Sequence, residues 1–245
     1  PGTAHALQRT RGHLDALLWR RDVRNAAAEF AAASIARGAR DSAAIDGADV
    51  AVVDDSPMGR VLAAAQRVTA AAPAQAETWS RAPLQVLAHL HTLAAIDVCD
   101  RAELGMPRTG SVADDPLNIG SLPEPPNLGA LGRWVDGSRD LPGLLVAALV
   151  HAELMHVRPF TWGSGLIARG IVRIILIERG LDPTPFSVPE LGMLELGRPA
   201  YVRAIRSYGE GDLESCVQWF AGAVSRGAQA VGRSTDSGQS AAPST

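Results

Sequence analysis

The sequence predicts a mainly α-helical protein with one hydrophobic core. Of its 245 residues, 47% are hydrophobic, which is enough for a single globular domain with some decoration. Residues 144–155 and 166–177 are apolar on nearly every side, as expected of helices at the centre of a bundle. No regular alternation of strands and helices is visible. We therefore expect an all-α fold in which strand is limited to one small hairpin.

The elements of the first half follow from helical spacing and from breakers. Residues 12–37 combine helix-forming alanine and arginine with leucines at 14, 17 and 18, which indicates a helix. Two further helices are expected over 58–72 and 75–104, separated by Ala-Pro-Ala. Residues 105–127 are rich in proline, glycine and aspartate, so we expect a loop there that carries the small hairpin.

The second half is expected to be helical again. Helices are predicted over 128–136, 141–156, 165–179 and 191–208, and a last one begins near Asp212. Residues 227–245 are small and polar and are expected to form a disordered tail. We accordingly divide the chain into an N-terminal helical segment (1–75), a core (76–226) and this tail.

Charge and cysteine content exclude several classes of protein. The formal net charge is −3 and no basic run is present, which argues against a nucleic-acid partner. The chain has no lysine, so it lacks a Schiff-base lysine and a P-loop lysine. Two cysteines indicate no disulfide framework, and no apolar run reaches the length of a membrane span. Without a visible signal peptide, we expect a soluble cytoplasmic protein.

The loop Arg-Pro-Phe-Thr-Trp-Gly-Ser-Gly, residues 158–165, interrupts the most apolar part of the chain. Gly163 and Gly165 let backbone N–H groups approach a ligand, and Ser164 can cap the helix that follows. A glycine-rich turn that leads into a helix N-terminus favours an anion. Arg169 lies on that apolar helix and should meet a carboxylate or a phosphate, because a buried unpaired charge is costly. Helix capping with an internal salt bridge is the simpler alternative.

This stretch resembles the signature of the Fic (Fido) family, His-Pro-Phe-x-Asp/Glu-Gly-Asn-Gly-Arg-x-x-Arg. The matching positions are Pro159, Phe160, Gly163, Gly165 and Arg169. The segments PRTGSV, RPAYVRAI and GDLESCVQWF also resemble, in turn, the lead into the family's target-docking hairpin and its last two helices. The resemblance implies a Fic/Fido-like helical core with a hairpin flap, nucleotide binding by the 163–165 amides and Arg169, and AMP transfer from ATP to protein hydroxyls.

The departures from the signature fall on its catalytic positions. Arg158 stands where the family has its histidine base, Trp162 replaces the acid that holds Mg²⁺, and Ser164 and Leu166 replace the asparagine and the first arginine. Arginine cannot accept a proton near neutral pH, and tryptophan offers no oxygen ligand. We therefore expect a catalytically impaired relative that binds ATP, another nucleotide or an anion without Mg²⁺. It would act as a regulatory or interaction protein whose partner docks on the flap.

Two alternatives stay open. The first is an active transferase of a nucleotide monophosphate or another phosphorylated group, in which Arg158 stabilises phosphoryl charge. His156 is no obvious substitute base, since two residues rotate a helical side chain by about 200°. The second and weaker alternative is an NAD(P)-binding oxidoreductase, suggested by the Gly-x-Gly-x-x-Ala pattern of 163–168, which requires a preceding strand.

An inhibitory-like pattern precedes the core. Ser42-x-x-x-Asp46-Gly47 resembles the Ser/Thr-x-x-x-Glu-Gly/Asn motif of one class of Fic proteins. The resemblance implies that Asp46 pairs with Arg169 and blocks productive placement of ATP. A simple cap and turn is the alternative.

The histidines give no metal site. Glu153 and His156 have the spacing of a di-iron half-site, but a second copy on another helix is missing. His89, His91 and His151 are best interpreted as ordinary helix residues, so no metal ligand is assigned.

Overall fold

The computed structural model describes residues 2–49 and 56–239, and every regular element within them is helical. The all-α class expected from the sequence is confirmed. In chain order the elements, one of which is a 3-10 turn (η1), are α1 (Thr3–Leu18), α2 (Arg21–Asn25), α3 (Ala27–Ile45), α4 (Pro57–Ala71), η1 (Ala72–Gln75), α5 (Ala76–Trp79), α6 (Pro83–Ala95), α7 (Leu128–Gly137), α8 (Gly143–Val157), α9 (Ser164–Glu178), α10 (Pro189–Leu196), α11 (Arg198–Gly209) and α12 (Leu213–Gln239).

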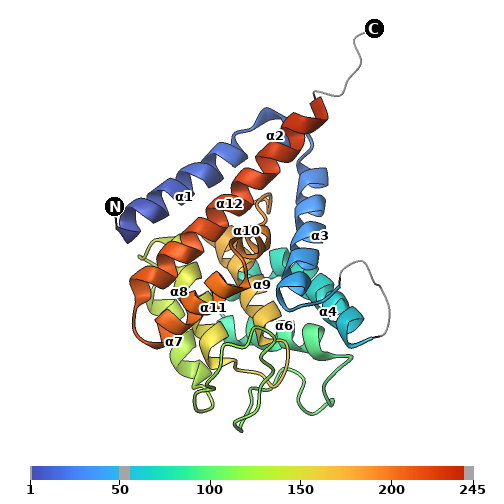
Figure 1. Ribbon diagram of the computed structural model, residues 1–245, viewed down its shortest axis with the longest axis vertical. Coiled ribbons are helices and arrows are strands. Elements are labelled where there is room, and N and C mark those ends of the chain that lie inside the picture. Colours follow the sequence, from blue (N-terminus) through green and yellow to red (C-terminus); the bar gives the residue numbers. More distant parts are fainter. Residues whose placement is uncertain (1, 50–55, 240–245) are drawn as a thin grey trace.

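The two apolar helices predicted from the sequence are α8 and α9, and they lie at the centre of the molecule (Figure 1). They pack against each other and are joined by the short loop 158–163. Helices α3, α4, α6 and α10 contact α9, while α11 and α12 cover α8. Neighbours on several sides explain why both helices are apolar nearly all round.

The N-terminal segment shares this core. Helix α1 runs along α12 across one face of the molecule, and α3 packs between α4 and α10 (Figure 1). Leu14 on α1, Ile45 on α3 and Ile171 on α9 belong to one continuous hydrophobic cluster. Because α3 packs against α9, the inhibitory-like pattern at its end lies beside the signature loop.

The expected β-hairpin flap is not found: among residues 2–49 and 56–239 the structure contains no strand. Residues 108–122 form an irregular loop at the lower end of the molecule in Figure 1. Here the guanidinium of Arg108 replaces a strand ladder: it donates to the carbonyl oxygens of Gly110, Pro123, Glu124, Val157 and Arg158. Side-chain donors satisfy the backbone, and Pro116 in this loop lacks the N–H group that a ladder needs.

The expectation of a disordered tail from 227 is wrong for residues 227–239, because these residues continue α12. Ala228 and Ala230 are buried, so small residues pack the helix where the composition indicated disorder. A Cβ on Gly227 would lie 2.1 Å from the Val188 carbonyl oxygen, and one on Gly192 only 1.8 Å from that of Ala223. These glycines therefore permit a close crossing of α10 and α12. Residues 240–245 lie outside the described residues.

Three predicted helices are divided in the structure. The helix expected over 12–37 is the end of α1, all of α2 and the first half of α3, with breaks at residues 19–20 and at residue 26. The helix expected over 75–104 is η1, α5 and α6, with an interruption before Pro83, and regular structure ends at Ala95. The helix expected over 191–208 is α10 and α11, separated by Gly197, whose φ of 84° interrupts the helix. None of the helices within the described ranges is long and apolar enough to cross a membrane.

Candidate functional site

The signature loop is shaped by two left-handed residues. Helix α8 ends at Val157, its C-cap Arg158 has a φ of 42°, and Gly163 precedes α9 with a φ of 75°. Gly163 is thus the N-cap, and the prediction that Ser164 caps α9 is wrong. The Ser164 hydroxyl instead accepts the Phe160 N–H at 3.1 Å and so closes the loop on itself. Gly163 is required because other residues adopt this backbone conformation at a cost.

Arg169, on α9, meets the residues predicted as inhibitory. Its Nη2 lies 2.7 Å from Asp46 Oδ2, and its side chain is 0% exposed while that of Asp46 is 6% exposed. Arg169 Nε donates to Ser42 Oγ at 2.8 Å, and Nη2 also donates to the Ser42 carbonyl oxygen. Gly47 then takes a φ of 91°, which turns the chain away from α3. The pairing that the sequence suggested is present in the structure, and Asp46 reaches the arginine without the extra methylene of glutamate.

Electrostatics favour a charged Arg169 despite its burial. Burial alone would lower the pKa of the guanidinium, but Asp46 raises it above the ordinary value. His151 on α8 is fully buried, and its Nε2 is 2.5 Å from the Tyr201 hydroxyl. Burial, with a contribution from Arg169, lowers the His151 pKa to about 3. His151 is therefore a neutral core residue behind the site.

Two buried polar atoms of the pair have no hydrogen-bond partner among the described residues: Arg169 Nη1 and Asp46 Oδ1. Both lie next to Gly165, since a Cβ there would be 3.2 Å from Nη1 and 3.5 Å from Oδ1. A side chain at position 165 would therefore press against both unpaired atoms. Buried polar atoms without a partner are what a ligand oxygen or a water would satisfy.

Asp114, which the sequence analysis did not single out, occupies the amide of Gly163. Asp114 Oδ2 accepts the Gly163 N–H at 3.0 Å. Burial raises the pKa of Asp114 to about 7, and the bond to Gly163 offsets part of that rise. Nothing in the local pattern Ala-Asp-Asp-Pro marks this aspartate, because the residue it contacts lies 49 positions away along the chain.

The signature loop borders a pocket of about 330 Å³. It lies between α3, α4, the 108–122 loop and the start of α9. Its lining residues are Asp46, Met58, Val61, Asp114, Asp115, Pro116, Trp162, Gly163 and Leu166. Trp162 stands where the family has its metal-binding acid, so this position gives an aromatic wall. Asp46 and Asp115 are each paired with an arginine, whereas no described cation forms an ion pair with Asp114.

Arg158, proposed from the sequence as the residue replacing the family histidine, is bound to the 108–122 loop. Its Nη1 lies 2.8 Å from Asp115 Oδ2, and Nη2 donates to the carbonyl oxygens of Gly120 and Ser121. The side chain is 4% exposed. These contacts tie Arg158 to the 108–122 loop. They would have to break before its guanidinium could bind a phosphate.

The nearby histidines do not supply a base. The ring of His156 faces Tyr208 at 6.0 Å and touches Gly209, so it points toward α11. His91 stacks on Phe160 with ring centroids 4.1 Å apart and accepts the Gly105 N–H. Burial lowers the pKa of His91 to about 4, so this ring is a neutral support under the loop.

Metal and dinucleotide interpretations find no support in the geometry. Within the described residues no three His, Cys, Asp or Glu side chains are grouped so that they could hold a metal ion. The dinucleotide fingerprint requires a strand before Gly163, and α8 occupies that place. The Gly-x-Gly-x-x-Ala pattern of 163–168 therefore does not stand in the strand–turn–helix unit that this fingerprint requires.

The charge of Asp114 should make stability depend on pH. An acid whose pKa rises on folding binds its proton more tightly when folded, so its contribution to stability falls as pH rises from about 4 to about 7. We expect Asp114→Asn to raise the melting temperature at pH 7.5 and to leave it nearly unchanged at pH 4.5. Thermal unfolding at both pH values measures this, with the exposed Asp100→Asn as control. An equal shift at both pH values would contradict the assignment.

Comparison with solved structures places this geometry in a known fold. A Fic family protein from Desulfovibrio desulfuricans G20 matches with a TM-score of 0.74 and 19% identity, over 94% of this chain and 75% of that one. Fic-1 from C. elegans matches with a TM-score of 0.72 and 16% identity, over 96% and 73%. No family model and no curated protein matches the sequence. Arrangement and topology together show that this chain has the Fic (Fido) fold.

Proposed function

We propose that this protein is a catalytically impaired, Fic-fold nucleotide- or anion-binding protein with a regulatory or interaction role. The observation that carries the proposal is the unpaired Nη1 of Arg169, which is buried next to Gly165 in the first turn of α9. A phosphate oxygen that reached Nη1 would receive a charge-assisted hydrogen bond from a donor held in place on a helix.

The start of α9 supports an anion at the same place. Within the described residues no acceptor pairs with the N–H groups of Ser164, Gly165 and Leu166. These groups carry the partial positive charge of the helix, and Arg169 adds a full charge one turn later. Trp162 is half-buried in the wall of the pocket, where it can stack on a nucleotide base.

Two carboxylates of the chain itself hold this site closed. Asp46 neutralises Arg169, and Asp114 occupies the Gly163 amide. An incoming phosphate must displace or out-compete both carboxyl groups, so we infer an autoinhibited site. The motif Ser42–Gly47 supplies one inhibitory group and the flap supplies the other.

Loss of transfer chemistry follows from the substituted positions. Arg158 is a cation tied to Asp115, and Trp162 offers no oxygen to Mg²⁺. ATP or another nucleotide would therefore bind without the usual metal contact. A protein partner is proposed to dock on the 108–122 loop, whose arrangement Arg158 and Arg108 maintain.

Removing the Asp46 plug should increase nucleotide affinity. We expect Asp46→Ala to bind ATP at least about tenfold more tightly than the wild type, because Arg169 then has only the phosphate as its charged partner. Calorimetric titration with ATP, with and without Mg²⁺, measures the change, and Asp100→Ala is the matched surface control. Adding ATP should also recover the thermal stability that the unpaired arginine loses.

A second substitution keeps the test informative if the first weakens the fold. Gly165→Ala in the Asp46→Ala background places a methyl group 3.2 Å from Arg169 Nη1. We expect this double variant to lose the affinity for ATP that Asp46→Ala gained, although the second substitution changes no charged residue. Arg169→Ala should abolish it too. If either double variant bound ATP as tightly as the Asp46→Ala single variant, ATP would not bind at this site.

One observation favours the alternative of an active transferase. Asp114 is the carboxylate of the pocket without an ion-pair partner, and its pKa of about 7 suits a general base. Transfer of a labelled nucleotide monophosphate to protein hydroxyls that disappears in Asp114→Asn would establish this alternative. Absence of label in the wild type and in Asp46→Ala would support the impaired form.

A further inference from the structure

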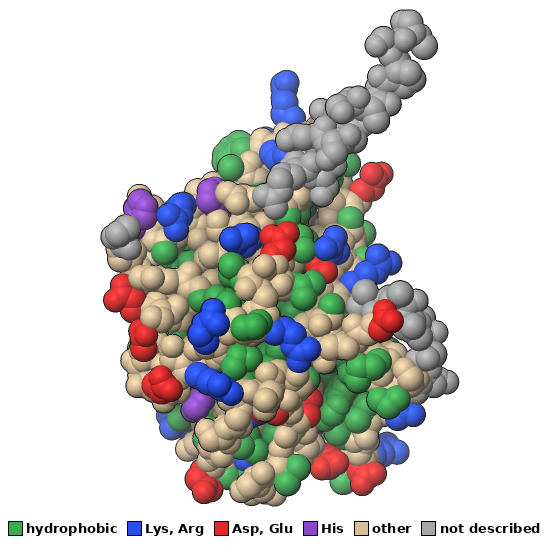
Figure 2. Space-filling model, in the orientation of Figure 1, with side chains coloured by type: hydrophobic (Ala, Val, Ile, Leu, Met, Phe, Trp, Pro, Cys, Tyr) green, Lys and Arg blue, Asp and Glu red, His purple; other side chains and the backbone are tan. Residues whose placement is uncertain are grey.

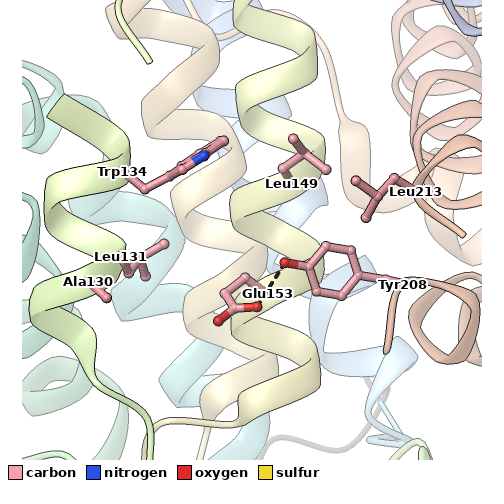
Figure 3. Close-up of a pocket in the computed structure, with 7 residues that line it drawn as sticks. All are labelled: Ala130, Leu131, Trp134, Leu149, Glu153, Tyr208 and Leu213. Atoms are coloured by element: carbon pink, nitrogen blue, oxygen red, sulfur yellow. Dashed lines mark hydrogen bonds between the residues drawn. The ribbon is translucent and has the colours of Figure 1, made fainter. Parts of the chain in front are cut away.

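A second pocket lies away from the signature loop, between α7, α8, α11 and the start of α12 (Figure 3). Its volume of about 420 Å³ falls within the range of small-molecule sites, roughly 300–1,000 Å³. Its lining residues are Ala130, Leu131, Trp134, Leu149, Glu153, Tyr208 and Leu213. None of these residues lines the pocket of Trp162, so the two sites are separate.

A single carboxylate lies among these apolar side chains. Figure 3 shows Glu153 on α8 between α7 and Tyr208, with its carboxylate bonded to the tyrosine hydroxyl. Tyr208 donates to Glu153 Oε2 at 2.8 Å, which fixes the carboxylate and leaves Oε1 for another donor. Within the described part of the chain no arginine forms an ion pair with Glu153. Among the described residues, therefore, no cation is in ion-pair contact with this carboxylate.

The neighbouring histidine does not supply the missing charge. His156 lies one turn along α8, and burial lowers its pKa below the ordinary value, so it is neutral at pH 7. Near the pocket the turn into α12 adds three exposed acids, Glu210, Asp212 and Glu214. Figure 2 shows basic side chains on this side of the molecule, where α11 lies, and the α11 arginines Arg198 and Arg206 donate to carbonyl oxygens of the 108–122 loop.

The rest of the pocket is suited to an apolar body. Trp134 projects from α7 toward Leu149 across the pocket, and Leu131 lies beneath it on the same helix (Figure 3). Trp134 is 38% exposed and Leu213 is 45% exposed, so both present apolar surface to a ligand. An aromatic face beside a carboxylate is a combination that attracts an ammonium group with a hydrophobic substituent.

We propose that this pocket binds a small organic cation, a primary amine with an aryl or branched aliphatic body. The ammonium group would donate to Glu153 Oε1, while the apolar body fills the space between Trp134, Leu149 and Leu213. An anion is excluded by the acids at the pocket, and a wholly apolar ligand would leave the carboxylate without a partner. The site is independent of the nucleotide site proposed above.

The test compares two probes that differ in the charged group alone. Calorimetric titration of the full chain with 2-phenylethylamine and with 2-phenylethanol at pH 7.5 measures the preference for charge. We expect the amine to bind about tenfold more tightly, as a hydrogen bond to a charged group supplies. Glu153→Gln should remove this preference, because the amide still accepts the Tyr208 hydroxyl but carries no charge.

Two further variants complete the experiment. Glu195→Gln, an exposed acid on α10, is the matched control and should keep the wild-type preference. Trp134→Ala should weaken binding of both probes, since each loses the aromatic wall. Equal affinity for amine and alcohol in the wild type, no binding of either probe, or an unchanged preference in Glu153→Gln would each overturn the proposal.

Discussion

Arg173→Met is expected to lower the free energy of unfolding by about 3–5 kcal/mol, because it leaves a buried carboxylate unpaired. Arg173 on α9 and Glu190 on α10 are 2% and 1% exposed and form two bonds, of 2.7 and 2.8 Å. The guanidinium also donates to the hydroxyl and the carbonyl oxygen of Ser34 on α3. Three helices therefore lose a shared polar centre. Urea unfolding followed by circular dichroism measures the change.

The control for this prediction is an ion pair of the same type at the surface. Arg81 and Glu77 are 69% and 79% exposed, so Arg81→Met should change stability by less than about 1 kcal/mol. The double variant Arg173→Met with Glu190→Leu should recover part of the loss, since no unpaired charge remains. Equal effects of Arg173→Met and Arg81→Met would show that burial of the pair is unimportant.

Arg108→Met is expected to release the 108–122 loop and to lower the free energy of unfolding by about 3 kcal/mol. The buried guanidinium donates to five carbonyl oxygens, two of which belong to the end of α8. Without it these acceptors must turn to solvent, which separates the loop from the signature segment. Hydrogen exchange of peptides covering 106–127 should become faster, while peptides from α9 should change little.

The exposed Arg101, in the same loop region, provides the comparison. Arg101→Met removes an arginine without removing this set of acceptors, so exchange in 106–127 should stay at the wild-type rate. If Arg108→Met likewise left exchange unchanged, the loop would be held by its other contacts, such as the bonds of Asp114 to Thr161 and Gly163.

Much of the candidate site was accessible from the sequence because its parts lie in short local patterns. The apolar runs on either side of Arg158–Gly165 identified α8 and α9, and their burial made a partner for Arg169 necessary. The Ser42–Gly47 pattern then indicated Asp46 as that partner. In each case the residue type restricts its surroundings: a buried arginine needs a charged partner, and a glycine-rich turn needs backbone conformations that other residues rarely adopt.

Predictions that rested on amino-acid composition alone were wrong in two segments. Proline and glycine in 105–127 indicated a hairpin, but a single arginine organises this loop through side-chain bonds. Small polar residues after 227 indicated disorder, yet small residues are what a closely packed helix crossing requires. The local sequence does not show that Arg108 bonds the end of α8 or that Gly192 meets Ala223, because these partners lie far away along the chain.

By itself the sequence determined the helical class, the two central helices and the presence of a glycine-rich turn before Arg169, since these depend on periodicity and on local backbone preference. Only the tertiary structure decided which side chains contact one another at the site. It placed Asp114 on the Gly163 amide and bound Arg158 to the 108–122 loop. It also left Glu153, in a separate pocket, bonded to Tyr208 but without an ion-pair partner among the described residues. The physical reason is that charge pairing and burial depend on distances between segments, which no single stretch of sequence specifies.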